Sequence, residues 1–170
     1  MTEHVHRYRT RCSWSGSTAA GYEGYDRSHD GVVVHAGDGG RAPTGDANVA
    51  ALALSSDAAF RGDPSRLNPE QLLVLAASSC QLLAFLAVAA RARLDVVAYE
   101  DDAEGEMPAT KGRTGLTSIV LRPRVTFGAS CGVPSPERFA HLVEVAHREC
   151  FIANSLCTPV TVEPELVVGD

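Results

Sequence analysis

The chain has 170 residues, which is close to the usual size of one domain. Hydrophobic residues make up 45% and charged residues 21%, a globular balance that excludes a disordered, collagen-like or coiled-coil chain. The net charge of −6 and a single lysine, Lys111, argue against nucleic acid as the main partner, because phosphate binding requires clustered Lys and Arg. We therefore expect one globular domain over residues 1–170.

The first part of the chain predicts short strands joined by irregular segments. Arginines alternate with less polar residues over 5–14, which indicates a half-exposed strand. Residues 15–30 are rich in Gly and Ser and predict a turn or an irregular edge, whereas three valines at 32–34 predict a short strand. Gly, Pro and Asp recur throughout residues 37–69 and predict a loop. A loop of that length inside a compact domain is unusual and often functional.

The clearest local signal marks the start of a long helix. Asn68 can act as the N-cap, Pro69 as the first helical residue, and Gln71 as the partner in a capping box. Arg91 and Arg93 suit the negative end of the helix dipole. We expect a helix over residues 69–93.

The same helix must be tested as a membrane span. Residues 72–90 carry no charge and are just long enough to cross a bilayer. Polar residues at 78–81 interrupt them, and a helix that is apolar on all sides can equally be the buried centre of a soluble fold. The N-terminus has no apolar signal core. We expect a cytoplasmic protein without a membrane partner.

The second part predicts strands around a further helix. Residues 100–106 are acidic and predict a surface loop or strand edge. Residues 115–127 alternate as a strand, and Pro123, which cannot donate to a ladder, indicates an edge strand or a bulge. A helix should begin at Ser135, and a last strand is expected over 160–166. This order predicts an α+β fold with antiparallel sheet. The apolar stripe of the second helix is Phe139, Leu142, Val143, Ala146 and Cys150.

The cysteines are the most reactive side chains of the sequence. Their number is odd, at five, and shows no dense framework, so we do not expect a secreted disulfide scaffold. Cys80 lies midway along the first helix and Cys150 on the inward stripe of the second. Most free cysteines are simply small buried hydrophobes. The polar neighbours of Cys80, and two core-facing helix surfaces that can meet, favour a reactive pair instead.

A reactive cysteine must be a thiolate, which requires a nearby cation or a helix N-terminus. Cys80 is too far from the start of its helix to benefit from the dipole. A guanidinium must then come from elsewhere, and the earlier segments offer Arg27, Arg61 and Arg66.

Two other interpretations use His147. It lies three residues before Cys150 and could form a Cys–His nucleophile pair with it. His147, Cys150 and Cys157 could also bind zinc, but their spacing fits no standard zinc pattern and lacks an obvious fourth ligand. We expect neither a metal nor an organic cofactor.

Two segments together resemble a known family. Residues 68–73 read NPEQLL and precede Cys80 in an alanine-rich helix, and residues 146–150 read AHREC. This combination resembles the OsmC/Ohr family, the osmotically inducible and organic hydroperoxide resistance proteins, over nearly the whole chain. The resemblance implies an OsmC-like fold, with antiparallel sheets wrapped around long central helices in an intertwined homodimer.

The resemblance also implies an activity and its residues. Members are thiol peroxidases, and Cys80 matches the cysteine that reacts with organic hydroperoxides, with hydrogen peroxide as a further candidate substrate. Cys150 matches the second cysteine, which would form a disulfide with the Cys80 sulfenate. A dithiol reductant, a lipoyl or thioredoxin-like protein, would then restore both thiols. Cys157 stays open as an alternative resolving cysteine.

The family's arginine has two candidates. Arg61 resembles the catalytic arginine of the OsmC branch, and Glu70 would hold it. The Ohr branch takes its arginine from an earlier turn, which favours Arg27 instead. The chain departs from the family in having Gln81 and Phe151 after the two cysteines, where Phe and Pro are frequent. The alternative function is a non-catalytic protein of the same fold that binds a small molecule or senses redox state.

Overall fold

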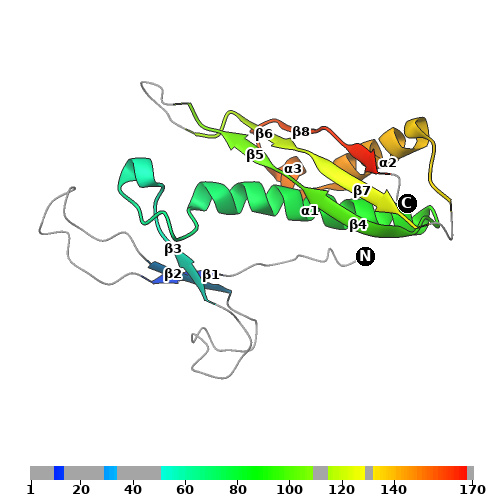
Figure 1. Ribbon diagram of the computed structural model, residues 1–170. Coiled ribbons are helices and arrows are strands. Elements are labelled where there is room, and N and C mark those ends of the chain that lie inside the picture. Colours follow the sequence, from blue (N-terminus) through cyan, green and yellow to red (C-terminus); the bar gives the residue numbers. More distant parts are fainter. Residues whose placement is uncertain (1–9, 14–28, 34–50, 109–114, 129–131, 168–170) are drawn as a thin grey trace, which may run out of the picture. The chain divides into compact units, whose positions relative to one another are not determined.

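The computed structural model describes residues 10–13, 29–33, 51–108, 115–128 and 132–167 (Figure 1). The chain divides into two compact units, Met1–Pro69 and Glu70–Asp170. Strands and helices together confirm the expected α+β class. The first unit contains β1 (Thr10–Ser13), β2 (His29–Val33), β3 (Leu52–Leu54) and the short 3-10 helix η1 (Ala58–Phe60). After α1 (Pro69–Arg91), the second unit continues with β4 (Val96–Asp101), β5 (Glu104–Glu106), β6 (Ser118–Leu121), β7 (Pro123–Phe127), α2 (Pro136–Glu149), α3 (Phe151–Ser155), β8 (Val160–Val162) and β9 (Glu165–Val167).

The first unit is built on an antiparallel sheet in the order β1-β2-β3. The strand expected over 5–14 is confirmed at residues 10–13, and the strand expected over 32–34 is confirmed at 32–33; the other residues of those two segments lie outside the described residues. Strand β2 begins earlier, at His29, so its first two residues lie in the segment that was expected to form a turn. The expectation of a loop over 37–69 was wrong where β3 and η1 occur. Each has three residues, too few for a periodic pattern to show in the sequence.

The turn after β3 is held by side-chain and backbone constraints. The Asp57 carboxylate accepts a hydrogen bond from Ala59 N at 2.8 Å and so caps η1. Arg61 closes η1 in the left-handed region at φ 64. A Cβ on Gly62 would lie 1.6 Å from the backbone oxygen of Ser56, so this close approach requires glycine.

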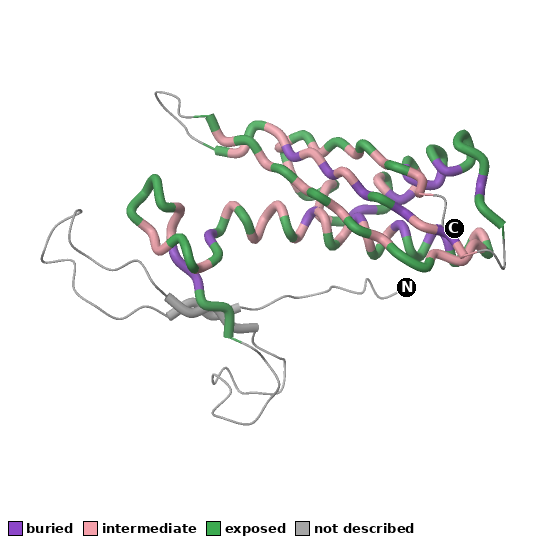
Figure 2. The backbone as a smooth tube through the Cα atoms, in the orientation of Figure 1, coloured by how far each residue is buried: buried purple, intermediate pink, exposed green. Residues whose placement is uncertain are grey.

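Helix α1 begins at Pro69, as expected, and ends at Arg91. One stripe of it is buried, whereas leucines on its other faces remain exposed (Figure 2). Its length and composition would allow it to span a membrane, a property that core helices of soluble proteins share. The buried stripe consists of Ala77, Gln81, Phe85, Val88 and Ala89.

Two three-stranded sheets form the second unit, in the orders β4-β7-β9 and β5-β6-β8. The expected antiparallel pairing occurs between β4 and β7 and between β5 and β6, while β8 and β9 add in parallel. Pro123 was expected to mark an edge strand or a bulge. The edge strand was wrong, because β7 is the central strand of its sheet, whereas the β4–β7 pairing does contain a register shift, between Val96 and Ala98. Pro123 is tolerated as the first residue of that strand.

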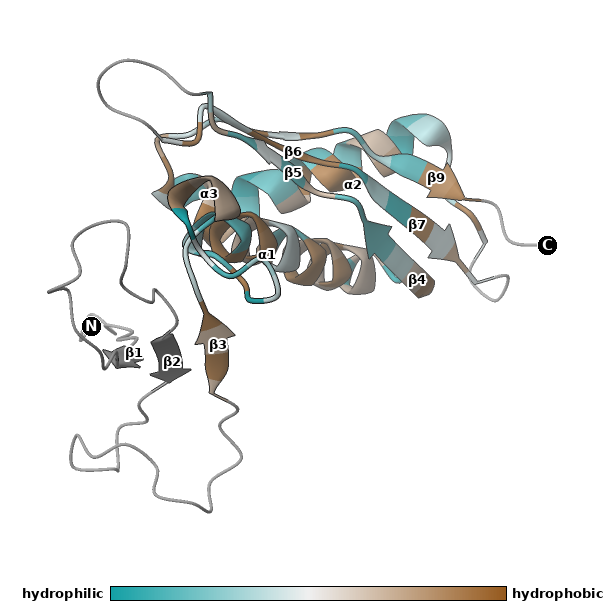
Figure 3. Ribbon diagram, turned by 60° about the vertical axis from the view of Figure 1, so that its left-hand side comes forward, coloured by the Kyte–Doolittle hydropathy of each residue, from teal (hydrophilic) through white to brown (hydrophobic). Residues whose placement is uncertain are grey.

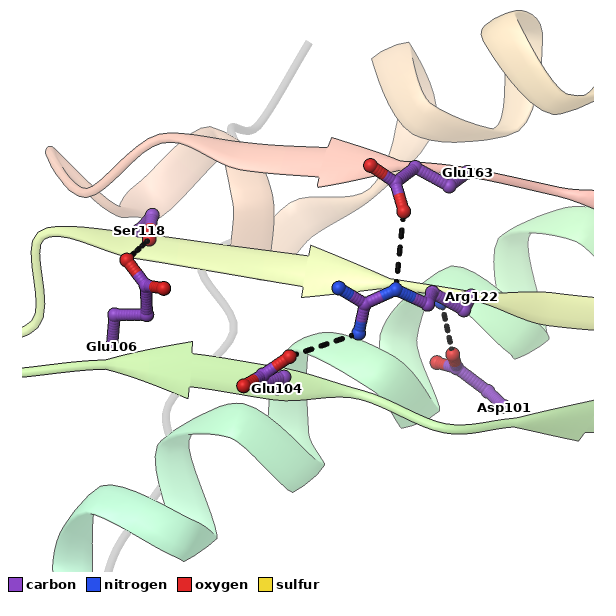
Figure 4. A network of polar contacts seen from close by, with 6 residues as sticks. All are labelled: Asp101, Glu104, Glu106, Ser118, Arg122 and Glu163. Atoms are coloured by element: carbon purple, nitrogen blue, oxygen red, sulfur yellow. Dashed lines mark hydrogen bonds and ion pairs between the residues drawn. The ribbon is translucent and has the colours of Figure 1, made fainter.

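Residues 100–106 end β4 and form β5, and both are edge strands, so of the two expected alternatives, a surface loop or a strand edge, the strand edge is confirmed. Two of the acidic side chains, Glu100 and Glu104, are exposed and pair with arginines of neighbouring strands. Arg122 lies between Glu104 and Glu163, at 3.1 Å from each (Figure 4). Arg124 pairs in the same way with Glu100 and Glu165. Cross-strand pairs of this kind stabilise the register modestly.

The main core lies where α1 and α2 pack against β7. Three phenylalanines meet edge to face, with ring centroids 6.0 to 6.5 Å apart. Helix α2 starts as expected, because the Ser135 hydroxyl accepts from Arg138 N, and its predicted stripe is buried throughout. The phenylalanines are Phe85, Phe127 and Phe139.

Candidate active site

Two thiols meet between the two long helices of the second unit. Cys80 lies in the middle of α1 and is partly exposed, whereas Cys150, which ends α2, is completely buried. Both are free thiols, and Cys80 lies close enough to Cys150 to affect its ionisation. Burial raises the pKa of Cys150, and the proximity of Cys80 raises it further. The structure thus brings together the two cysteines that the sequence singled out.

Backbone amides of α3 point at both sulfur atoms. The N–H of Ile152 donates to Cys80 Sγ at 3.5 Å. Amides of Ala153 and Ile152 also lower the pKa of Cys150, against the larger effect of burial. These donors arise because Cys150 is at once the C-cap of α2 and the N-cap of α3. Sequence reasoning missed them, since it expected a cation to be the only available partner of Cys80.

Cys80 borders an apolar pocket of about 510 Å³, within the size range of small-molecule sites. Leu83, Ala84, Ala87 and Phe151 supply its apolar wall. Polar side chains line it too, and two of them, Arg91 and Glu149, form an ion pair. A small molecule with an apolar body could therefore reach the Cys80 sulfur from this side. The other polar lining residues are Arg148 and Asn154.

The remaining predicted site residues are more scattered. Glu70 starts the same helix as Cys80 and is partly buried. Arg61 is exposed and belongs to the first unit, and Arg27 lies outside the described residues. Cys157 is exposed beyond α3.

The structure gives little support to a role for Arg66 or for His147 in the candidate site. Arg66 is paired with Asp63 at 3.5 Å, one turn away in its own segment. The Nδ1 atom of His147 is buried without a hydrogen-bond partner among the described residues. Within that part of the chain, no group of three or more His, Cys, Asp or Glu side chains could hold a metal ion.

Comparison with known proteins identifies the family. The family model for OsmC-like proteins matches residues 62–165, which is more than half of the chain. This protein therefore belongs to the OsmC-like protein family, as the NPEQLL segment and the two cysteines suggested.

Solved structures agree with this assignment. An OsmC-like protein of unknown function from Vibrio cholerae O1 biovar eltor is 29% identical, with a TM-score of 0.78 over 94% of this chain and 99% of the other. An organic hydroperoxide resistance protein from Elizabethkingia anophelis is 16% identical, with a TM-score of 0.67 over 99% and 100% of the two chains. An organic hydroperoxide resistance protein OsmC from Legionella pneumophila is 18% identical, with a TM-score of 0.62 over 96% and 98%. No curated protein matches the sequence significantly.

Proposed function

We propose that this protein is a cytoplasmic thiol peroxidase that reduces organic hydroperoxides, with hydrogen peroxide as a second substrate. The observation that carries the proposal is the proximity of the Cys80 and Cys150 thiols beside an apolar pocket. Family membership supports it, because relatives with the same fold are organic hydroperoxide resistance proteins. The apolar wall suits the organic part of such a substrate.

The proposed cycle uses the two cysteines in sequence. The Cys80 thiolate attacks the O–O bond, takes one oxygen as a sulfenic acid and releases an alcohol. Cys150 then attacks the Cys80 sulfur, the S–O bond breaks, and water leaves as a Cys80–Cys150 disulfide forms. A dithiol, carried by a lipoyl or thioredoxin-like protein, is oxidised to its own disulfide and returns both thiols. No metal or organic cofactor enters this cycle.

An arginine completes the proposed site. A guanidinium beside Cys80 would stabilise its thiolate and orient the peroxide. We propose Arg61 for this role, held by Glu70, with Arg27 as the alternative. The amide of Ile152 already donates to the same sulfur, so the arginine would add to an existing donor rather than act alone.

Steady-state consumption of cumene hydroperoxide with dihydrolipoamide as the reductant tests the proposal. The protein should turn over many times, and Cys80→Ser should abolish turnover. Cys157→Ser is the matched control and should keep full activity, because Cys157 is exposed outside the thiol pair. Arg61→Ala and Arg27→Ala, compared in the same assay, identify the arginine by the larger loss. An active Cys80→Ser protein, or an inactive native protein, would refute the proposal.

The pocket also favours a second candidate, a protein that binds a small apolar ligand without turnover. Such a protein would bind cumyl alcohol, the product analogue, yet consume no hydroperoxide. A redox sensor would react once per chain and then stop, even with the dithiol present. The same assay, extended to single-turnover conditions, separates these outcomes.

A further inference from the structure

The two sulfur atoms of the proposed disulfide differ in how far they can be reached from outside. Cys80 is partly exposed and lines the pocket of about 510 Å³, whereas Cys150 is completely buried. Of the two thiols, only Cys80 borders the pocket. Thiol–disulfide exchange begins when a thiolate attacks one of the two sulfurs, and access is one of the factors that decide which. The reduction step of the proposed cycle must therefore choose between these two atoms.

Backbone hydrogen bonds hold Cys80 at the junction of α2 and α3. Ile152 follows Cys150 by two residues, and its N–H donates to Cys80 Sγ at 3.5 Å. The carbonyl of Cys150 accepts from the N–H of Asn154 at 3.0 Å, which fixes the backbone on the other side of the same junction. Cys80 Sγ thus lies between the pocket, which it lines, and the chain segment that carries Cys150.

The acidity of the leaving thiol acts against attack on Cys80. Burial raises the pKa of Cys150, and a less acidic thiol leaves more slowly. The amides of Ala153 and Ile152 lower the same pKa and offset part of this effect. Leaving-group acidity changes an exchange rate gradually, whereas a completely buried sulfur can be attacked only after the surrounding structure opens. We therefore expect access to outweigh acidity.

We propose that the reducing dithiol enters the same pocket as the hydroperoxide and attacks Cys80 Sγ, so that Cys150 is the leaving thiolate. The inference rests on the proposed peroxidase function and deepens it, because it assigns the sulfur that the reductant attacks. The apolar wall of the pocket, which includes Leu83 and Ala84, suits the carbon chain of such a dithiol.

The proposed reduction proceeds in two exchange steps. One sulfur of the dithiol bonds to Cys80 Sγ as the Cys80–Cys150 bond breaks, and Cys150 leaves with the electron pair and takes up the proton of the attacking thiol. The second thiol of the reductant then attacks its own first sulfur. This step closes the disulfide of the reductant and releases Cys80 with the second electron pair and proton. The Ile152 N–H is placed to stabilise the departing Cys80 thiolate.

The first test locates the mixed disulfide in the full-length native protein. Diamide oxidises the thiols without a peroxide, and 6-mercaptohexan-1-ol, a monothiol, cannot close a ring and so leaves a mixed disulfide. Samples quenched in acid at short times are mapped by mass spectrometry. The adduct should be at Cys80, with Cys150 free. An adduct at Cys150 would overturn the inference, and so would the absence of a Cys80–Cys150 disulfide after diamide.

Two exposed alanines of α1 provide a matched pair of variants. Ala87 lies two helical turns after Cys80, on the same side of the helix, and lines the pocket. Ala90 is exposed on the same helix outside the pocket lining. Leucine at position 87 should therefore narrow the route to Cys80 Sγ, whereas leucine at position 90 should leave the route open.

The second test compares the rates at which 6-mercaptohexan-1-ol reduces the diamide-formed disulfide. Ala87→Leu should slow this reaction about tenfold, and Ala90→Leu should react as the native protein does. Equal rates in the two variants would contradict entry through the pocket. If Ala87→Leu does not fold, cumyl alcohol replaces it, because an occupant of the pocket should slow the exchange in the native protein. If both exchange results hold but cumene hydroperoxide is not consumed, only the peroxidase proposal fails.

Discussion

The two cysteines differ in their surroundings although they lie close together. Cys80 is partly exposed at the pocket and receives a backbone N–H at its sulfur. Cys150 is buried, and its pKa is raised. An accessible thiol with a donor suits the first reaction with a peroxide, whereas a shielded and less acidic thiol avoids side reactions until its partner is oxidised. This asymmetry agrees with the proposed order of events.

Oxidation should link Cys80 to Cys150. The two thiols lie close enough for Cys80 to raise the pKa of Cys150, and a disulfide requires such proximity. Peptide mapping after one equivalent of peroxide should find this pair in nearly all oxidised chains. Recovery of a Cys80–Cys157 peptide instead would identify Cys157 as the resolving residue, and Cys157→Ser should leave the expected pair intact.

The reduced protein should lose stability at alkaline pH. Burial raises the folded-state pKa of both Cys150 and Tyr99 above their ordinary values of 9.0 and 10.0. Above about pH 9 the unfolded chain releases protons that the folded chain retains, so the free energy of unfolding falls by up to about 1.4 kcal/mol per pH unit for each group. Below the ordinary values their contribution is fully present.

Urea unfolding between pH 7 and 11 measures this decline. Tyr99→Phe should flatten the part above pH 10, because it removes one of the two groups. Cys157→Ser should reproduce the native curve, since Cys157 is exposed. A native stability that is constant across this range would contradict the prediction.

At the scale of elements, the start of a helix could be predicted from the sequence where a capping residue or a proline marks the boundary. Pro69 starts α1, and the Ser135 hydroxyl caps α2, since each depends on residues close in the chain. The strand β3 was not recognised, because it has three residues and is stabilised by a partner distant in the sequence. Acidic residues at 100–106 left a surface loop and a strand edge both open, and pairing with arginines of neighbouring strands decides for the strand edge.

The packing of β5 against α1 predicts a position-specific effect of glycine substitution. A Cβ on Gly105 would lie 2.6 Å from Cγ2 of Val74, so one of the two elements must shift. Gly105→Ala should lower the free energy of unfolding by about 1–3 kcal/mol, as overpacking does. Gly115→Ala is the matched control, because its Cβ would meet no atom within 4 Å. Thermal unfolding of both variants measures the difference, and equal melting temperatures would show that the contact is not tight.

At the scale of the whole molecule, several large apolar side chains of α1 and α3 are exposed. Leu75, Leu83 and Phe151 are 56%, 64% and 77% exposed, respectively, and α1 is hydrophobic over most of its length (Figure 3). Apolar surface of this kind frequently marks an interface. We propose that it lies between two copies of the chain in a homodimer, as the sequence resemblance implied.

Mixed dimers should reveal shared active sites. Glu70 and Cys80 lie on one helix, about 15 Å apart along its axis at ~1.5 Å per residue, too far for a single side chain to connect them. If Glu70 braces an arginine at Cys80, it acts on the site of the other copy. Chains with Cys80→Ser and chains with Glu70→Ala should each be inactive alone, but their heterodimer should regain activity at one of its two sites.

The control is a homodimer of Cys80→Ser chains taken through the same mixing procedure, which should stay inactive. Sedimentation establishes the oligomeric state of each sample before the assay. A verified mixed dimer without recovered activity, or a fully active monomer, would refute shared sites. Unaltered activity of Glu70→Ala alone would show that Glu70 only favours the helix N-terminus.

Local chemistry in the sequence was enough to predict the α+β class, the start of both long helices and the inward position of Cys150, because caps, prolines and apolar periodicity act between neighbouring residues. The donor amide of Ile152 at the Cys80 sulfur could not be predicted in this way. It depends on how α1 and α3 pack, and those segments are far apart in the chain. Packing of distant elements brings this donor to the thiol, and it leaves no periodic mark in the sequence.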